Sequence, residues 1–252
     1  MLYLLDPRNP DAPFPSANQA EKEPNGLLAV GGELSPTRLL SAYRHGIFPW
    51  YSEGQPILWW SPDPRTVLFP EHLKLSRSLR KTLRKQEFSV SIDMCYEKVI
   101  QACAEPRDGD EGTWITPAMA TAYTQMHELG HAHSVETWRG SELVGGLYGI
   151  AIGKVFFGES MFSRATDASK VALAHLVSRL TEWGFRLIDC QVYSQHLISL
   201  GAEEISREDF IQHLDDWCEL PGHMESWRGE PRYPTEQCFA EEQPANRKPQ
   251  QP

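Results

Sequence analysis

The chain of 252 residues lacks any apolar run long enough to cross a bilayer, although 40% of its residues are hydrophobic. It also lacks a recognisable signal peptide, because the first ten residues, MLYLLDPRNP, have no basic segment ahead of an apolar stretch and soon reach a proline. The length suits one large domain, or a small domain joined to a medium one. We therefore expect a protein that is not exported and has no membrane partner.

Cysteine is scarce and shows no pairing pattern. The chain has an odd number of cysteines, none of them in C-x-x-C spacing: Cys95, Cys103, Cys190, Cys218 and Cys238. Secreted domains held by disulfides usually carry an even number at short spacings. We predict a reduced, cytoplasmic compartment in which the thiols act as small core residues.

Positive charge is also scarce, since the net charge is -10, which argues against non-specific coating of nucleic acid. Residues 74–85, KLSRSLRKTLRK, reverse this sign and contain no acid. On a helix, the face opposite the leucines carries Arg77, Lys81, Arg84 and Lys85. Such a face favours contact with the phosphates of a nucleic acid. An ordinary solvated face is the alternative, although solvated faces normally mix both signs.

Aromatic residues gather in residues 46–65, GIFPWYSEGQPILWWSPDPR, where prolines separate them. Each proline removes a backbone donor and restricts the residue before it, so this segment cannot form a regular helix. Large rings on such a backbone build either the wall of a pocket and a stacking platform, or a small core beneath a loop. Both alternatives stay open from this segment alone.

The hydrophobic pattern becomes regular from Arg65 onward and predicts an α+β fold: a largely antiparallel mixed sheet after a small N-terminal unit. We place the N-terminal domain at residues 1–62, the larger domain at 63–235 and a disordered tail, polar and rich in proline, at 236–252. The predicted helices cover 36–43, 76–86, 94–104, 117–129, 167–183, 194–200 and 206–219. The predicted strands cover 65–70, 88–92, a set within 133–158 that turns at 139–140 and 153–154, and 185–192.

Residues 127–131, HELGH, match the zinc-protease motif H-E-x-x-H letter for letter. That site needs both histidines one turn apart on a continuing helix. Gly130 lies inside the motif and the following residues alternate like a strand, so we expect the helix to end between His127 and His131. No third ligand follows, since Thr137 stands where the metzincin spacing would need His. We predict no metal site and interpret the histidines as suited to a helix C-terminus.

Residues 158–163, GESMFS, resemble a nucleophile elbow, but Phe162 stands in place of its closing glycine, so we do not expect a serine hydrolase. Glu159 in this segment follows the apolar residues 155–157. A carboxylate there is costly to bury unless it is paired or lines a cavity. Exposure at the end of a strand is the alternative interpretation of Glu159.

The apolar strand predicted at 185–192 contains two polar residues, Asp189 and Gln191. Side chains two apart on a strand point to the same face, so both would need polar partners there. A carboxylate at the end of a buried strand is a candidate general base. A purely structural hydrogen-bonded pair is equally compatible with this pattern.

Taken together, these segments resemble the bacterial leucyl/phenylalanyl-tRNA–protein transferases. The similarity lies between residue 23 and about residue 205, in EPNGLLAVGGELSPTRLLSAYRHGIFPWYS, PILWWSPDPR, EGTWIT, HELGHAHSVETW, GGLYGIAIGKVFFGESMFS and LIDCQV. The resemblance implies a small N-terminal domain joined to a domain like the GNAT acyltransferases. It also implies transfer of Leu or Phe, and sometimes Met, from its tRNA to the N-terminal Lys or Arg of a protein, which creates a degradation signal.

The resemblance further implies roles for individual residues. The wall of an apolar pocket for the aminoacyl side chain would include Trp50, Trp114, Leu147 and Phe156. Relatives commonly carry Met at position 147, a near-isosteric exchange that keeps the pocket volume. Asp189 and Gln191 match the acid and amide of the family's catalytic strand, and Glu159 matches the acid of GESMFS. The tRNA-contacting helix matches Arg77, Lys81, Arg84 and Lys85. We expect no cofactor, no metal and a monomer.

For the chemistry, we expect Asp189 to orient the α-amine of the acceptor, directly or through Gln191, and to accept its proton. The alternative is that a ribose hydroxyl of the tRNA shuttles the proton while Asp189 only positions the amine. Two other classes of protein compete with this interpretation. A GNAT-type acetyltransferase would need a glycine-rich turn for coenzyme A, which ESMFSRATDASK lacks. A non-catalytic tRNA-binding module would explain the basic helix but not the paired acid and amide.

Overall fold

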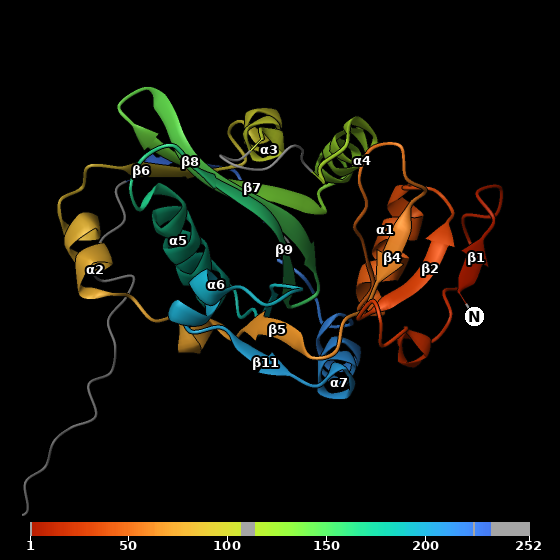
Figure 1. The fold of residues 1–252 in the computed structure, drawn as a ribbon. Coiled ribbons are helices and arrows are strands. Elements are labelled where there is room, and N and C mark those ends of the chain that lie inside the picture. The colour runs from red at the N-terminus through yellow and green to blue at the C-terminus, as the bar shows by residue number, and fades with distance from the viewer. Residues whose placement is uncertain (1, 107–113, 224, 233–252) are drawn as a thin grey trace, which may run out of the picture.

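The computed structural model describes residues 2–106, 114–223 and 225–232, which form two sheets and seven α-helices (Figure 1). The N-terminal sheet has the strand order β1-β2-β4-β3 and consists of β1 (Tyr3–Leu5), β2 (Leu27–Gly31), β3 (Phe48–Pro49) and β4 (Leu58–Trp60). The sequence predicted only the helix of this unit, because its strands are short and interrupted by proline and glycine. That helix, α1 (Pro36–Arg44), begins where the Ser35 side chain accepts a hydrogen bond from the Arg38 amide.

The larger sheet carries the rest of the fold and has the strand order β11-β5-β10-β9-β8-β7-β6-β12. Its strands are β5 (Arg65–Leu68), β6 (Ser89–Ile92), β7 (Ala132–Arg139), β8 (Glu142–Ile152), β9 (Val155–Ser163), β10 (Leu187–Asp189), β11 (Glu203–Ile205) and β12 (Gly229–Arg232). Among these described strands only β9 and β10 pair in parallel. The predicted α+β class, with a largely antiparallel mixed sheet, is confirmed.

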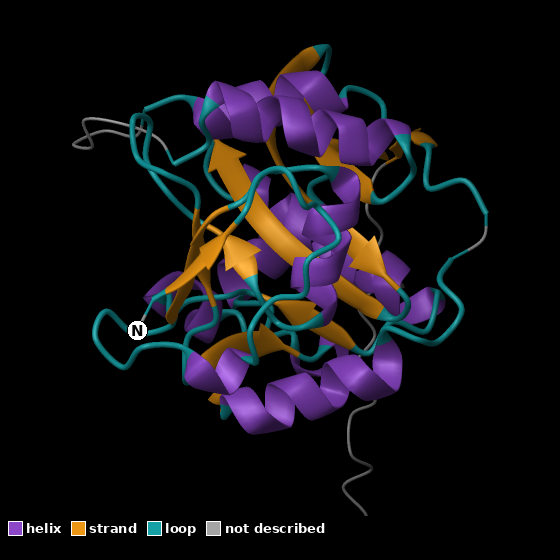
Figure 2. Ribbon diagram, turned by 90° about the vertical axis from the view of Figure 1, so that its right-hand side faces the viewer, coloured by secondary structure: helices purple, strands orange, loops and turns teal. Residues whose placement is uncertain are grey.

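Helices cover both faces of the larger sheet (Figure 2). They are α2 (Arg77–Arg84), α3 (Tyr96–Ala104), α4 (Pro117–Glu128), α5 (Ala168–Glu182), α6 (Gln195–Ser199) and α7 (Arg207–Trp217). α3 and α4 lie on one face of the sheet and α5 on the other (Figure 1). Each predicted helix is present, with ends shifted by a few residues. No helix in the described ranges is both long and apolar enough to cross a membrane.

The predicted strand 185–192 is wrong in its extent, because β10 ends at Asp189. Beyond it the chain turns, and Gln191 adopts a left-handed backbone conformation with φ 58°. The prediction that Asp189 and Gln191 share a face of one strand is therefore wrong, since a residue at positive φ breaks the alternation of side chains. The two residues come together through the turn instead.

One apolar core joins the N-terminal unit to the larger sheet. It contains Leu39 and Trp59 from the first unit together with Tyr123 and Phe157 from the second. A separate cluster lies between α5 and the opposite face of the sheet. The first core places α1 and the residues that follow it against β9. The domain limits 1–62 and 63–235 stay predictions, and the tail at 236–252 lies outside the described residues.

Candidate active site

A cavity of about 490 Å³ opens between β9 and the chain that follows β10. A smaller cavity of about 120 Å³ adjoins it on the side of the N-terminal unit. The two cavities share four lining residues: Trp114, Glu159, Gln191 and Val192. The two cavities therefore meet beside the carboxylate of Glu159 and the side-chain amide of Gln191.

The larger cavity has an apolar end formed by the face of β8, β9 and β10 that packs on α5. Its apolar lining includes Leu147, Phe156, Leu173, Leu176, Ile188 and Leu197. Of the predicted pocket residues, Trp114, Leu147 and Phe156 line this cavity, whereas Trp50 lines only the smaller one and is 43% exposed. All four residues therefore line one or both of the adjoining cavities, and Trp50 lies on the side of the smaller cavity.

The aromatic segment supplies both a wall and a core, the two alternatives that its sequence left open. Trp59 is fully buried and donates its indole N–H to the Gly31 carbonyl. Trp50 packs against Trp60 with ring centroids 5.9 Å apart, and Trp60 donates to the Trp50 carbonyl at 2.7 Å. These contacts fix the backbone that presents Trp50 to the smaller cavity.

A β-bulge places Glu159 inside the molecule rather than at a strand end. On β9, Gly158 pairs with Gly149 and Ser160 pairs with Tyr148, so Glu159 is the extra residue between two consecutive pairs of the ladder. A bulge bends its strand and re-aims the side chain it carries. The exposed alternative for Glu159 is therefore wrong.

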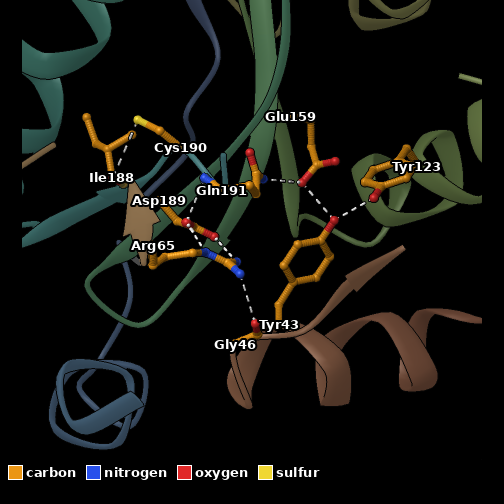
Figure 3. A network of polar contacts seen from close by, with 9 residues as sticks. All are labelled: Tyr43, Gly46, Arg65, Tyr123, Glu159, Ile188, Asp189, Cys190 and Gln191. Atoms are coloured by element: carbon orange, nitrogen blue, oxygen red, sulfur yellow. Dashed lines mark hydrogen bonds and ion pairs between the residues drawn. The ribbon is translucent and has the colours of Figure 1, made fainter. Parts of the chain in front are cut away.

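Glu159 accepts hydrogen bonds from both units of the chain (Figure 3). Its Oε1 accepts from Tyr43 Oη at 2.7 Å and from Gln191 Nε2 at 3.3 Å. Tyr43 Oη also contacts Tyr123 Oη at 2.5 Å. Burial raises the pKa of Glu159 to about 7, against the lowering effect of the two tyrosine hydroxyls, while the charge of Asp189 raises it further. Near neutral pH this carboxyl is therefore close to half ionised.

Asp189 is fully buried and paired on both of its oxygens (Figure 3). Oδ1 accepts from Arg65 Nε at 2.8 Å and from the backbone N–H of Gln191 at 2.9 Å, and Oδ2 accepts from Arg65 Nη2 at 2.7 Å. Arg65 also donates to the Gly46 carbonyl at 3.1 Å. The bidentate pair therefore ties β5 and β10 to the backbone of the N-terminal unit.

Sequence reasoning missed three residues of this site: Arg65, Tyr43 and Tyr123. Arg65 carried a usable signal, because a cation at the start of the apolar strand R-T-V-L needs a buried partner. Tyr43 and Tyr123 gave none, since each reads as an aromatic core position on its helix. Their contact with Glu159 depends on the packing of α1 and α4 against β9.

The H-E-x-x-H segment does not form a zinc-protease site. α4 ends at Glu128 and Gly130 adopts a positive φ of 79°, so His127 lies on the helix and His131 lies beyond it. The Nδ1 atom of His127 lies 2.8 Å from the Ala132 carbonyl oxygen. The prediction that the helix ends between the two histidines is confirmed.

The basic face of α2 is exposed as its sequence predicted. Leu79 and Leu83 are buried, whereas the opposite face presents Arg77, Lys81, Arg84 and Lys85 to solvent. α2 lies against α5, on the far side of that helix from β9 (Figure 1). None of the four cations lines either cavity. A ligand contacting both regions must therefore extend across α5.

Comparisons with family models and with individual proteins point to one family over most of the chain. The family model described as leucyl/phenylalanyl-tRNA protein transferase matches residues 67–215, and the model of its N-terminal domain matches residues 32–63. A protein of Nitrosomonas europaea with this transferase name is 58% identical over 224 residues, which cover 89% of this chain and 95% of that protein. A protein of the same name from Aromatoleum aromaticum is 62% identical over 210 residues, which cover 83% of this chain and 89% of that protein.

Among solved structures, a GCN5-related N-acetyltransferase from Kribbella flavida aligns with a TM-score of 0.31 and 11% identity, over 68% of this chain and 61% of that one. A score this low carries no argument about function. The assignment of fold therefore rests on the strand order described above.

Proposed function

The chain belongs to the leucyl/phenylalanyl-tRNA protein transferase family, and from that premise we propose that it moves leucine or phenylalanine from aminoacyl-tRNA to the N-terminal amine of a protein. It is an aminoacyltransferase. The observation that carries the proposal is the meeting of an apolar cavity with Glu159 and Gln191. Methionine as a further donor, N-terminal Lys or Arg as acceptor, and a degradation signal as product are the finer parts of this proposal.

The apolar end of the larger cavity suits the donor side chain. Leucine and phenylalanine are unbranched at Cβ, whereas isoleucine and valine carry a second substituent there that the wall of the cavity would have to accommodate. Discrimination by shape of this kind amounts to about 1–3 kcal/mol for a methylene-sized difference. Phe156 and Leu147 form part of this wall. Phe156→Ala should therefore reduce transfer of both Leu and Phe by about tenfold, while Leu147→Met should leave donor choice unchanged.

The reaction exchanges an ester for an amide. The amine nitrogen bonds to the aminoacyl carbonyl carbon, the bond from that carbon to the ribose oxygen breaks, and the ribose oxygen gains a proton. The main task of the protein is to hold the two reactants together. The α-amine has a pKa of about 8 in model peptides and is partly protonated at neutral pH, so a nearby acceptor for its proton assists the attack.

The contacts favour Glu159 over Asp189 as that acceptor. Both oxygens of Asp189 are bound to Arg65, so taking a proton would break a buried ion pair. Glu159 instead has a raised pKa of about 7 and lines both cavities. In this account Asp189 positions the Gln191 backbone, and Gln191 and Glu159 hold the amine. The ribose-hydroxyl route remains the competing pathway for the proton.

The two macromolecular substrates would approach from different sides. The exposed cations of α2 provide phosphate contacts for the tRNA. The ionised form of Glu159 provides negative charge for the side chain of an N-terminal Lys or Arg, since the charge of Asp189 is balanced by Arg65. We place this activity in a cytoplasmic monomer that needs neither metal nor cofactor.

Purified protein with radiolabelled leucyl-tRNA and a peptide that begins with Arg tests the proposal. Label should appear in the peptide and should be absent when its N-terminus is acetylated, because acetylation removes the nucleophile. A peptide that begins with Glu is the matched control for acceptor charge. Label in the acetylated peptide, or in no peptide at all, would overturn the proposed reaction.

A further inference from the structure

Four buried tyrosines surround Glu159 in the core between the N-terminal unit and the larger sheet. They come from four different elements, and each is at most 3% exposed: Tyr43 of α1, Tyr96 of α3, Tyr123 of α4 and Tyr148 of β8. Two of their hydroxyls are accounted for, since Tyr43 donates to Glu159 and contacts Tyr123. The proposed function uses neither Tyr96 nor Tyr148.

The hydroxyls of Tyr96 and Tyr148 have no hydrogen-bond partner among the described residues. Buried polar groups are nearly always paired, because an orphaned donor loses the hydrogen bonds it made to water. Phenylalanine would fill the same space in this core without that cost. Two orphaned hydroxyls in one cluster therefore point to a ligand that protein atoms do not supply, and water is the ligand of suitable size.

Ring contacts connect Tyr96 and Tyr148 to Tyr123, whose hydroxyl contacts that of Tyr43 beside the carboxylate. The Tyr148 ring lies between the rings of Tyr123 and Tyr96, with centroid separations of 5.8 Å and 5.9 Å and edge-to-face geometry in both pairs. Burial, followed by the charge of Glu159, raises the pKa of both Tyr96 and Tyr148. The cluster thus extends from Glu159 to α3.

We propose that Tyr148 and Tyr96 are positioning residues for Glu159, because their hydroxyls hold internal water that extends the hydrogen-bond network of Tyr43 and Tyr123. A larger set of donors stabilises the ionised carboxylate in an otherwise apolar core. That the carboxylate then accepts the proton of the amine rests on the proposed function. Among the described residues, the other charged or titratable groups that face Glu159 or its tyrosines are Arg65, Asp189, Asp93, Cys103 and His127, whose ring stacks on that of Tyr96 with centroids 4.2 Å apart.

Infrared difference spectroscopy tests this network without requiring transfer activity. The C=O band of protonated Glu159, assigned by its loss in Glu159→Gln, would be followed against pH in each variant. Tyr148→Phe and Tyr96→Phe should each move the midpoint of this titration upward by about half a pH unit, because each removes a donor that favours the anion. Tyr51→Phe is the matched control, since its hydroxyl contacts Thr116 at 3.3 Å and should leave the midpoint unchanged.

Midpoints equal to that of the wild type in both variants would overturn the network, as would an equal shift in Tyr51→Phe. A variant that fails to fold is replaced by the other, since Tyr96 and Tyr148 belong to different elements. Failure of the wild type to transfer leucine would overturn the proposed function and leave the infrared result standing. The two ideas can therefore fail separately.

Discussion

At the scale of single residues, the site contains a fully buried carboxylate, Asp189, and a half-buried one, Glu159, in contrasting surroundings. Asp189 is paired with a guanidinium, whereas Glu159 contacts neutral donors. Burial penalises the charged form of both, but only a paired charge recovers this cost through a close counterion. The environment thus separates a carboxylate suited to hold structure from one suited to exchange a proton.

Asp189→Asn should lower the free energy of unfolding by about 3–5 kcal/mol, because it leaves the Arg65 cation buried without a counterion. Urea unfolding followed by circular dichroism measures the change. Asp6→Asn is the matched control, since it removes the same charge from an exposed pair with Arg8 and should leave the free energy of unfolding almost unchanged. Equal, small effects of both substitutions would contradict the structural role of the buried pair.

Glu159→Gln should make stability less dependent on pH. Burial raises the pKa of Glu159 in the folded protein to about 7, from an ordinary value of 4.5. Between these values the folded protein keeps a proton that the unfolded chain has lost, so the free energy of unfolding of the wild type falls as pH rises through that window. The variant, which cannot ionise there, should gain on the order of 2 kcal/mol over the wild type at pH 8 and little at pH 5.

Urea unfolding at both pH values measures this difference. Glu142→Gln is the control, because it changes an exposed carboxyl at the start of β8 and should follow the wild-type pH dependence. Parallel curves for the wild type and Glu159→Gln would mean that the carboxyl titrates alike in the folded and unfolded chain. That result would remove the basis for Glu159 as a proton acceptor near neutral pH.

At the scale of elements, α2 and β10 show what sequence patterns can and cannot predict. The leucine spacing of α2 correctly predicted the buried side and hence the exposed cations. For β10, apolar residues up to Val192 predicted too long a strand, because the turn at Gln191 depends on contacts with β5 and with the Asp189 side chain. The spacing of apolar residues along one element can be read from the sequence, whereas the residue at which a strand ends depends on its contacts with other elements.

Lys81→Ala on α2 should weaken the use of aminoacyl-tRNA without changing the chemistry. Removal of one phosphate contact should raise KM for the tRNA several-fold and reduce the slope of log affinity against log salt by about 1. Lys22→Ala removes one exposed cation from the N-terminal unit and is the matched control. An unchanged salt slope in Lys81→Ala would assign α2 to an ordinary solvated surface.

At the scale of the whole molecule, both units supply the candidate site. Tyr43 reaches Glu159 from α1, and the Gly46 carbonyl accepts from Arg65. The sequence pointed to Glu159, Gln191 and the apolar wall, but it could not predict the bulge that turns Glu159 inward or the packing that delivers Tyr43. Those features depend on contacts between the N-terminal unit and the larger sheet, and the spacing of apolar residues within either unit does not predict such contacts.

The shared apolar core predicts that the two units unfold together. Because this core contains Leu39 and Trp59 of the first unit and Tyr123 and Phe157 of the second, exposing either side removes contacts from the other. Urea transitions followed by tryptophan fluorescence and by far-ultraviolet circular dichroism should coincide. Two separate midpoints would show that the N-terminal unit is an independent domain and that its contacts with Glu159 are weak.

The central claim is that Glu159 takes the proton of the acceptor amine at the entrance to the donor cavity. The most direct measurement is the single-turnover rate of leucine transfer from bound leucyl-tRNA to an Arg-initiated peptide, as a function of pH, for the wild type and Glu159→Gln. The wild-type rate should rise with pH through about 7, and the variant should be slower by a factor of about 10² or more and lack that rise, with tRNA binding retained. A variant with the rate and pH profile of the wild type would contradict the claim and favour the ribose-hydroxyl route.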